Sequence, residues 1–375
     1  MGAVGNVLIV GGGIAGMTLA IGLSRQGIKS EIVELSTDWA VIGVGISMQG
    51  PAMRALRAID VLERIVDSGF GYSYFKACDV DGNVTDQVDL PSLNGPDHPA
   101  TMGVMRQALH EALKLAVAEA QVPVRLGVSL ADYHPLDDGI RVEFTDGSEG
   151  NYDLVVCADG ANSKMREMLF GTAHDGHYTG QAVWRATVDR PDDVDCRYSY
   201  FGPRNKAGFN PVSKDQMYIY LVQNLPEWKR LDEDELPGTM REQLSGYGGV
   251  LAAAREQVQD PKSIVYRPIT SLILPSPWYK GRVLLIGDAA HTATPHMAAG
   301  AGLAIEDSVV LAELLGGGMD VTIALEKFMD RRWERCRMTI ENSEQLGDWE
   351  KTPDLPEADP VGLFRESVKL LAQPI

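Results

Sequence analysis

Two spacings of apolar residues follow one another at the start of the chain. Asn6–Val10 is a short apolar run, typical of a parallel strand that is buried on both faces. After a glycine-rich turn, residues 17–27 have apolar positions at helical spacing and end at a glycine, as many helices do. A second short strand, Ser30–Val33, is followed by Glu34. The pattern predicts a strand–turn–helix–strand unit.

Two later segments also join a buried strand to a short turn. The apolar run Leu154–Ala158 ends at Asp159, and the run Val283–Ile286 leads to Asp288. A loop then reaches the glycine-rich start of an apolar helix at about residue 300. Strands that alternate with helices favour an α/β fold.

Residues 177–267 have a different pattern, with a period of two that indicates strands. Within Gln216–Val222, one face carries Met217, Ile219 and Leu221, and the other carries Tyr218, Tyr220 and Val222. One of these faces is expected to line a substrate pocket, although ordinary sheet packing would explain the same alternation.

The net charge and the cysteine pattern limit the binding partners and the metal sites that we expect. With 34 basic and 52 acidic residues the net charge is 34 − 52 = −18, which argues against nucleic acid or an anionic membrane as partner. The first basic residue, Arg25, follows the first apolar stretch instead of preceding it, unlike a secretory signal. We therefore expect a cytoplasmic protein. The four cysteines form no CxxC pair, so we expect free thiols and no metal site.

The glycines of the first turn have spacing that suits a dinucleotide diphosphate. Gly11 permits a tight turn, Gly13 lets the backbone approach the diphosphate, and Gly16 lets helix and strand pack closely. The helix N-terminus offers free N–H groups to the phosphates. Glu34 is placed to accept hydrogen bonds from a ribose. This unit alone does not distinguish NAD from FAD.

Three motifs together carry a resemblance: GGGIAG at 11–16, ADGANSKMR at 158–166, and GDAAH…P…GAG…IED within 287–307. The chain resembles the FAD-dependent aromatic hydroxylases of the para-hydroxybenzoate hydroxylase class, nearest to the salicylate and 6-hydroxynicotinate types. The resemblance extends from Val7 to about Leu315. It implies a tightly bound FAD.

The motifs and the resemblance together assign cofactor contacts to residues of many segments. They are Gly11, Gly13, Ile14, Ala15, Gly16, Glu34, Gly45, Ile46, Arg106, Leu130, Asp159, Asp288, Gly300, Ala301 and Gly302. From the residues alone, an acceptor such as the Asp288 carboxylate suits ribityl hydroxyls, and a helix starting near Gly300 can stabilise negative charge on a flavin. The alternative for Asp159 is a helix cap.

The chain departs from its relatives at two places beside the expected flavin. Many relatives have GQGxN where this chain has Ala299-Gly300-Ala301-Gly302, so backbone N–H groups would make the flavin contacts. The hydroxynicotinate type has a histidine where this chain has Ser47, which predicts a different substrate. We expect Ser47, Met217 and His296 to contact substrate.

The resemblance implies that NAD(P)H reduces FAD, that O2 forms a flavin C4a-hydroperoxide, and that an aromatic or heteroaromatic ring attacks its distal oxygen. His296 is the leading candidate for proton transfer or substrate binding, with a structural histidine as the alternative. The Pro295 carbonyl is expected to accept a hydrogen bond near the flavin, and Tyr218 or Tyr220 to relay a proton. His291 is more readily explained as structural. The single GxGxxG motif implies that NAD(P)H binds transiently.

Two other functions remain open from the sequence. An FAD-dependent oxidase or dehydrogenase without oxygen insertion would use the same motifs. A non-catalytic FAD-binding module is the other alternative. A flavin halogenase is disfavoured because the chain has no WxWxIP motif.

These observations predict a discontinuous, Rossmann-like FAD-binding domain and a sheet-rich substrate domain. The first would comprise residues 1–72, 101–176 and 268–345, and the second 73–100 and 177–267. Residues 346–375 would form a linker and a C-terminal helix, which packs on the body or across a homodimer interface.

Overall fold

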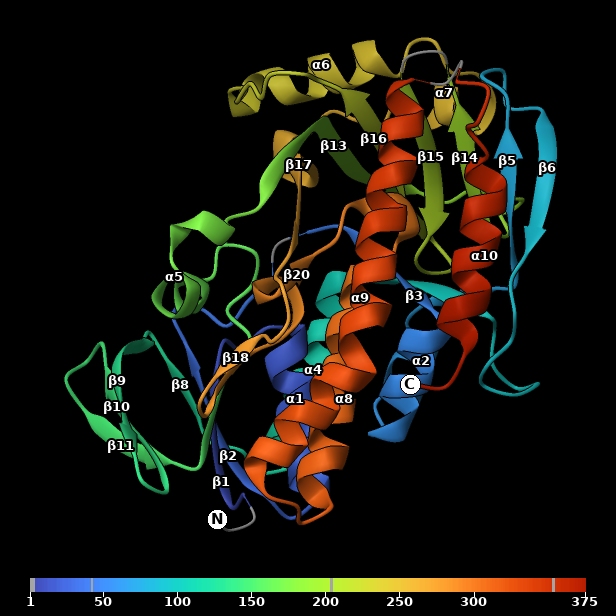
Figure 1. The fold of residues 1–375 in the computed structure, drawn as a ribbon. Coiled ribbons are helices and arrows are strands. Elements are labelled where there is room, and N and C mark those ends of the chain that lie inside the picture. Colours follow the sequence, from blue (N-terminus) through green and yellow to red (C-terminus); the bar gives the residue numbers. More distant parts are fainter. Residues whose placement is uncertain (1–3, 42, 203–204, 353–354) are drawn as a thin grey trace.

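The computed structural model describes residues 4–41, 43–202, 205–352 and 355–375 (Figure 1). The predicted strand–turn–helix–strand unit is present and lies within a six-stranded sheet. In sheet order its strands are β18 (Tyr279–Lys280), β19 (Val283–Leu285), β12 (Leu154–Cys157), β1 (Asn6–Val10), β2 (Lys29–Glu34) and β8 (Val124–Leu126). β1 pairs in parallel with β12 and β2, and its apolar residues are fully buried, as the sequence predicted.

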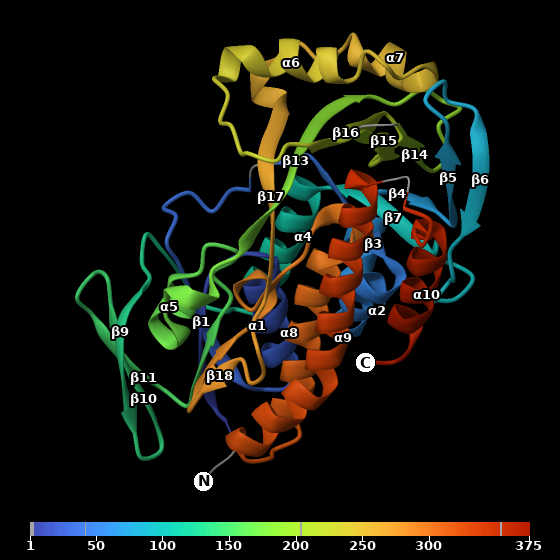
Figure 2. The same cartoon turned by 45° about the horizontal axis from the view of Figure 1, so that its top comes forward.

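Helices cover one side of this sheet, and a small antiparallel sheet lies on the other (Figures 1 and 2). On the helical side, α1 (Ile14–Arg25) packs against α4 (Arg106–Glu119) and α8 (Gly300–Gly316). The small sheet consists of β9 (Leu130–Leu136), β10 (Gly139–Phe144) and β11 (Glu149–Tyr152). Apolar residues from both sides join the strands in one large core.

The second large layer is an eight-stranded sheet. In order, its strands are β20 (His291–Thr292), β17 (Ile264–Ile273), β13 (His177–Asp189), β16 (Gln216–Asn224), β15 (Asn205–Pro211), β14 (Arg197–Phe201), β5 (Tyr74–Cys78) and β6 (Val84–Asp89). α6 (Leu236–Gln243) and α7 (Gly249–Arg255) cover its outer face and close a second core with it (Figure 2). Most of this sheet comes from the segments assigned above to the substrate domain. The division into two domains stays a prediction.

Shorter elements connect the two layers. They are the three-stranded sheet β3 (Gly45–Gln49), β7 (Thr101–Met105) and β4 (Phe70–Tyr72), with the helices α2 (Gly50–Ala58), α3 (Leu62–Val66) and α5 (Lys164–Phe170). The four cysteines are buried free thiols, as predicted. Among the residues described, no helix combines the length and apolar composition needed to span a bilayer.

Two C-terminal helices run beside both layers, α9 (Val321–Lys351) and α10 (Pro360–Ala372) (Figure 1). The linker that the sequence predicted from residue 346 begins instead as helix, because α9 extends to Lys351. α9 continues through Gly347, where a side chain would lie 2.9 Å from a ring carbon of His296. The glycine therefore lets the last turns of α9 approach the site, although glycine is unfavourable inside a helix.

Candidate active site

The turn between β1 and α1 has the close contacts that its glycines predicted. Gly11 has a φ of +111°, and a Cβ there would lie 2.4 Å from the Ala158 carbonyl oxygen. A Cβ on Gly16 would lie 1.9 Å from the Gly11 carbonyl oxygen, so only glycine allows this packing. A Cβ on Gly13, by contrast, would meet nothing within 4 Å. Gly11 and Gly16 therefore pack tightly against neighbouring backbone, whereas the space beside Gly13 is open.

The open position lies at the N-terminus of α1. No side chain caps this helix end, so its first N–H groups are available to an anionic ligand. Ile14 and Ala15 form the first helical residues. Glu34 is tied to the same turn, because its carboxylate accepts hydrogen bonds from the backbone N–H groups of Gly12 and Ser36, both at 2.8 Å. The geometry fits the diphosphate and ribose of FAD.

A cavity of about 360 Å³ lies between this part of the molecule and the eight-stranded sheet. Many of the predicted site residues line it. They are Gly45, Ile46, Ser47, Arg106, Tyr218, Tyr220, Asp288, Pro295, His296, Gly300 and Ala301. Segments that lie more than 250 positions apart in sequence thus share one cavity.

The N-terminus of α8 forms one wall of this cavity. Ala299, Gly300 and Ala301 line the cavity, and no side chain caps the helix. Its first N–H groups and the positive end of its dipole can therefore stabilise negative charge on a flavin ring. The Pro295 carbonyl already accepts a hydrogen bond from Ala298 N at 3.0 Å, within the turn that precedes the helix.

Asp288 faces the cavity from the end of β19. Burial raises the pKa of its carboxyl above the ordinary value, and the positive charges of His291 and Arg106 oppose this effect. A ligand that donates hydrogen bonds to the carboxylate would favour its ionised form. Ribityl hydroxyls are such donors, so the residue fits the predicted cofactor.

Three residues predicted to contact the cofactor have other surroundings. The Asp159 carboxylate accepts hydrogen bonds from Ser163 Oγ at 2.7 Å and Met165 N at 3.1 Å, the helix-capping alternative considered above. Leu130 is a core residue that is 6% exposed. Gly302 faces Ala52 of α2, beside a small hollow next to the main cavity.

Met217 corrects an expectation about substrate contact. Its side chain is 0% exposed and belongs to the core beneath α6 and α7. Tyr218 and Tyr220, one residue to either side, line the cavity instead. Because successive side chains of a strand point to opposite faces, Met217 and the two tyrosines cannot all reach one pocket.

His296 lines the cavity, but protein groups surround both of its ring nitrogens. Its side chain is 1% exposed. Nδ1 lies 2.9 Å from Thr294 Oγ1, which in turn lies 2.6 Å from Ser343 Oγ. Nε2 faces a carboxylate oxygen of Glu350 at 3.3 Å. These contacts favour the structural alternative, and a proton-transfer role for His296 stays a prediction.

Glu350 is a site residue that the sequence reasoning missed. It lies on the part of α9 that was assigned to a linker, and it also contacts Lys206 Nζ at 2.7 Å. Burial would raise its pKa, but the positive charges of Lys206 and His296 lower it to about 2. The carboxylate thus joins α9, β15 and the loop before α8.

Apart from Arg106, the cationic residues that line the cavity were also missed. The charged residues that line the cavity are Arg106, Arg185, Arg197, Lys206 and Arg267, against Asp288 and Glu350. In a chain of net charge −18, this surplus of positive charge in one cavity indicates an anionic occupant. Arg185 follows a buried tryptophan on β13, and the period-two pattern could have identified it as inward-facing.

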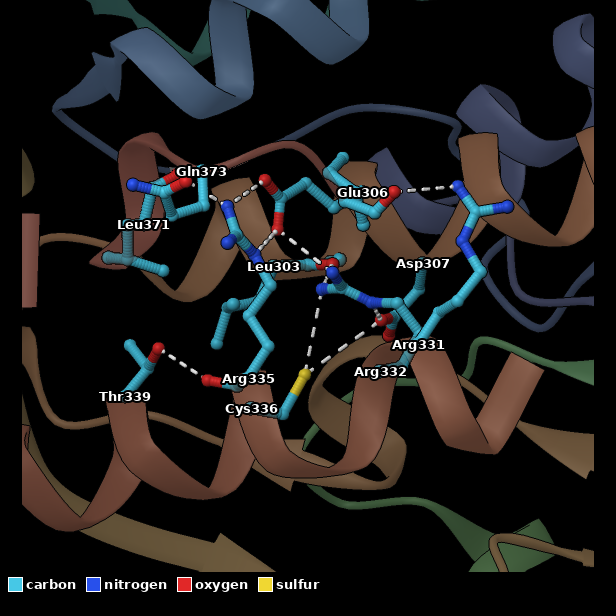
Figure 3. Close-up of polar contacts among 12 residues, drawn as sticks. Leu303, Glu306, Asp307, Arg331, Arg332, Arg335, Cys336, Thr339, Leu371 and Gln373 are labelled. Carbon is cyan, nitrogen blue, oxygen red and sulfur yellow. Dashed lines mark hydrogen bonds and ion pairs between the residues drawn. The ribbon is translucent and has the colours of Figure 1, made fainter. Parts of the chain in front are cut away.

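A buried ion network joins α8 to α9 (Figure 3) and extends to the loop that carries Asp288. The Asp307 carboxylate accepts hydrogen bonds from Arg332 Nε at 2.7 Å and from the backbone N–H of Gly287 at 2.9 Å, and His291 Nε2 lies 2.6 Å away. Burial opposes a charge on the ring, but Asp307 helps to hold the pKa of His291 well above its ordinary value. Glu306 adjoins this network through Arg332 and Arg335.

Comparison with known proteins agrees with this geometry. A family model described as "FAD binding domain" matches residues 5–320. The chain is 30% identical over 350 residues to the 2-heptyl-3-hydroxy-4(1H)-quinolone synthase of Pseudomonas aeruginosa, covering 92% of this chain and 90% of that protein. It is also 30% identical to the aurachin C monooxygenase/isomerase of Stigmatella aurantiaca, with the same coverage.

Solved structures show the same fold. The crystal structure of Klebsiella pneumoniae HpxO complexed with FAD and uric acid superposes with a TM-score of 0.84 at 23% identity, covering 98% of this chain and 92% of that one. The comparisons confirm the resemblance drawn from the three motifs. The chain belongs to the FAD-binding domain family and is an FAD-dependent monooxygenase of the aromatic hydroxylase class.

Proposed function

We propose that this enzyme hydroxylates a small aromatic or heteroaromatic ring that carries an anionic or strongly accepting oxygen, with NAD(P)H and O2 as co-substrates. The observation that carries the proposal is the single cavity where the N-terminus of α8 and Asp288 face the cationic inner face of the eight-stranded sheet. Relatives named for quinolone, aurachin and urate chemistry support a ring substrate with such oxygens.

The chain offers a complete set of groups for holding FAD. The open turn at Gly13 and the N-terminus of α1 would bind the diphosphate, with Glu34 beside the ribose. Asp288 would accept hydrogen bonds from the ribityl chain. Gly45, Ile46 and the first turn of α8 would hold the ring. When bound and reduced by NAD(P)H, FAD would activate O2, so that one oxygen atom of O2 enters the substrate and the other leaves as water.

The protein's own task is to orient the ring and keep water out. Tyr218, Tyr220 and Arg185 form the polar wall opposite the expected flavin. Leu346 of α9 and Phe364 of α10 line the cavity with apolar surface. Exclusion of water protects a reactive oxygen species from side reactions. Deprotonation of the substrate would be favoured by the nearby cations, without a dedicated base.

The test is a panel of hydroxylated benzoates, pyridines and quinolones incubated with the purified FAD-loaded protein. We expect at least one compound to stimulate NAD(P)H oxidation and to gain one oxygen atom, which isotope-labelled O2 would trace by mass spectrometry. An oxidase would consume O2 without nicotinamide and give no labelled product. That result would replace the proposal with the oxidase alternative.

A further inference from the structure

Asn210 occupies a central place between the two layers of the molecule. It lies on β15, its side chain is fully buried, and it faces the cavity residues Ser47 and Tyr218. Its amide oxygen accepts a hydrogen bond from Tyr72 Oη at 2.7 Å. Its amide nitrogen donates to Ser47 Oγ at 2.9 Å and to Tyr218 Oη at 3.3 Å. Both hydrogen bonds that the amide nitrogen donates thus go to hydroxyl groups of residues that line the cavity.

The orientation of the Asn210 amide determines whether the Tyr218 hydroxyl donates or accepts a hydrogen bond toward the cavity. A phenol oxygen can accept one hydrogen bond and donate another. Since Asn210 donates to it, the hydroxyl hydrogen of Tyr218 is left to point elsewhere, and the side chain lines the cavity. Among the hydrogen bonds of the described residues, Tyr218 donates none to the protein. Its hydrogen is therefore available to a ligand.

Arg185 adds a positive charge beside this hydroxyl. It lies on β13, directly across from Tyr220 of β16, and lines the same cavity. Burial lowers the pKa of its guanidinium, Tyr218 raises it and the positive Arg106 lowers it further. No carboxylate forms an ion pair with Arg185 within the part of the chain that the structure describes. Arg185 is partly buried, and a partly buried cation without a protein counter-charge is stabilised when a ligand supplies one.

We propose that Asn210 is a positioning residue that holds Tyr218 as a hydrogen-bond donor, and that Tyr218 with Arg185 selects ring substrates bearing an ionised oxygen over isosteric rings bearing an amino group. The proposal rests on the function proposed above, because it defines the substrate of that same cavity. The preference for an ionised oxygen thus depends on which way the buried Asn210 amide is oriented. Asn210 acts through Tyr218, because it does not itself line the cavity.

The test uses two coloured probes of nearly equal shape, 4-nitrophenolate and 4-nitroaniline, titrated into the FAD-loaded protein at mildly alkaline pH without NAD(P)H. Absorbance changes of probe and flavin give the two dissociation constants. We expect the wild type to bind 4-nitrophenolate at least about tenfold more tightly, which corresponds to about 1.4 kcal/mol. In Asn210→Asp, a carboxylate would accept from Tyr218 and repel the phenolate, so the ratio should fall to about one or invert.

Two further variants keep the proposal testable if Asn210→Asp does not fold. Tyr72→Phe removes the hydroxyl that donates to the Asn210 amide oxygen, and Tyr72 does not line the cavity. This variant should reduce the preference for 4-nitrophenolate by a smaller factor than Asn210→Asp does. Arg185→Met should weaken 4-nitrophenolate binding about tenfold and leave 4-nitroaniline binding unchanged. Asn94→Asp is the matched control, since Asn94 is also a buried asparagine, 3% exposed, and should leave the ratio unchanged.

Failure of the wild type to prefer 4-nitrophenolate overturns the proposal, and so does an unchanged ratio in the folded Asn210 or Tyr72 variant. Because binding is measured without NAD(P)H, it is separate from oxygen insertion. Selective binding without any hydroxylated product from the panel would contradict the proposed function alone. Hydroxylation with no change of ratio among the variants would contradict only the role of Asn210.

Discussion

At the scale of single residues, neighbours along one strand have opposite surroundings. Met217 is fully enclosed by the core under α6 and α7, whereas Tyr218 is held by Asn210 and faces the cavity. The side-chain alternation of a strand makes this separation unavoidable. Substitution of Met217 should therefore change stability, and substitution of Tyr218 should change ligand binding.

We expect Met217→Ala to lower the free energy of unfolding by about 2–5 kcal/mol, because it leaves a cavity in a closely packed core. Urea denaturation would measure the loss, and the affinity for 4-nitrophenolate should stay close to that of the wild type. Tyr218→Phe should give the reverse, with weaker phenolate binding and little change in stability. A Met217→Ala protein of normal stability that fails to bind the probe would contradict this assignment.

Glu350 predicts a pH-dependent contribution to stability. Its folded-state pKa of about 2 lies below the ordinary glutamate value of about 4.3, so folding favours the ionised form. This contribution is complete above the unfolded-state value and is lost as the pH falls through the folded-state value. Glu350→Gln should cost roughly 1–3 kcal/mol at pH 7, and the difference from wild type should shrink between about pH 4.5 and pH 2.

Urea unfolding at several pH values would measure this difference. Glu341→Gln is the control, because the Glu341 side chain is 53% exposed and its surface pair with Arg337 should contribute little. A difference between wild type and Glu350→Gln that stayed constant down to pH 2 would show that the ionised carboxylate is not the stabilising form.

At the scale of elements, two uncapped helix N-termini define the two ends of the expected cofactor. α1 begins at the open turn beside Gly13, and α8 begins at the cavity wall. α1 follows β1 of the six-stranded sheet directly, whereas α8 follows β20, the short edge strand of the eight-stranded sheet. The ion network around Asp307 fixes α8 to α9 (Figure 3). The Gly287 N–H group, which donates to the Asp307 carboxylate, ties the network to the loop that carries Asp288.

The open turn can be tested with one methyl group. In Gly13→Ala the new Cβ would meet no protein atom within 4 Å, so the chain should fold with wild-type stability. The methyl would occupy the space reserved for the diphosphate, and FAD affinity should fall at least about tenfold, or 1.4 kcal/mol. Fluorescence titration of the apoprotein with FAD would measure this. Gly238→Ala, also free of contacts within 4 Å but on α6, should leave FAD affinity unchanged.

At the scale of the whole molecule, the cavity is closed by parts of the chain that are distant in sequence. α10, close to the C-terminus, lies near β5 (Figure 1). It supplies Phe364, whose ring lies edge-on to that of Phe75 of β5 with centroids 5.3 Å apart. The Arg197 guanidinium lies 4.3 Å from the Phe75 ring centroid and 5.7 Å from that of Phe364. An expected homodimer interface for this helix stays a prediction.

Removing this ring should open the cavity to water. We expect Phe364→Ala to destabilise the protein by roughly 3 kcal/mol, since the residue is only 7% exposed, and to weaken 4-nitrophenolate binding several-fold. Hydroxylation should also become less efficient, with more NAD(P)H consumed for each hydroxylated product. Product yield per NAD(P)H oxidised would measure this, and an unchanged yield with unchanged affinity would show that α10 does not enclose the ligand.

Local sequence was enough for the parts of the molecule that depend on neighbouring residues. The β1–turn–α1–β2 unit follows from an apolar strand, three spaced glycines and an apolar helix that ends at a glycine, all within about 30 positions. The three motifs identified the FAD-dependent hydroxylase class, and the comparisons confirmed it. Such features have fixed spacing because turn geometry and backbone approach to a diphosphate are local requirements.

Only the tertiary structure decided which side chains share the cavity. The sequence showed the two faces of β16 but not which one looks inward, because burial depends on the helices that pack against the sheet. It placed Glu350 in a linker, whereas the extended α9 brings it to His296 and Lys206. Asn210 carried no recognisable signal, since its partners Ser47 and Tyr72 are more than 130 positions away. Hydrogen-bond partners so distant in sequence are set by the packing of layers, which local patterns do not encode.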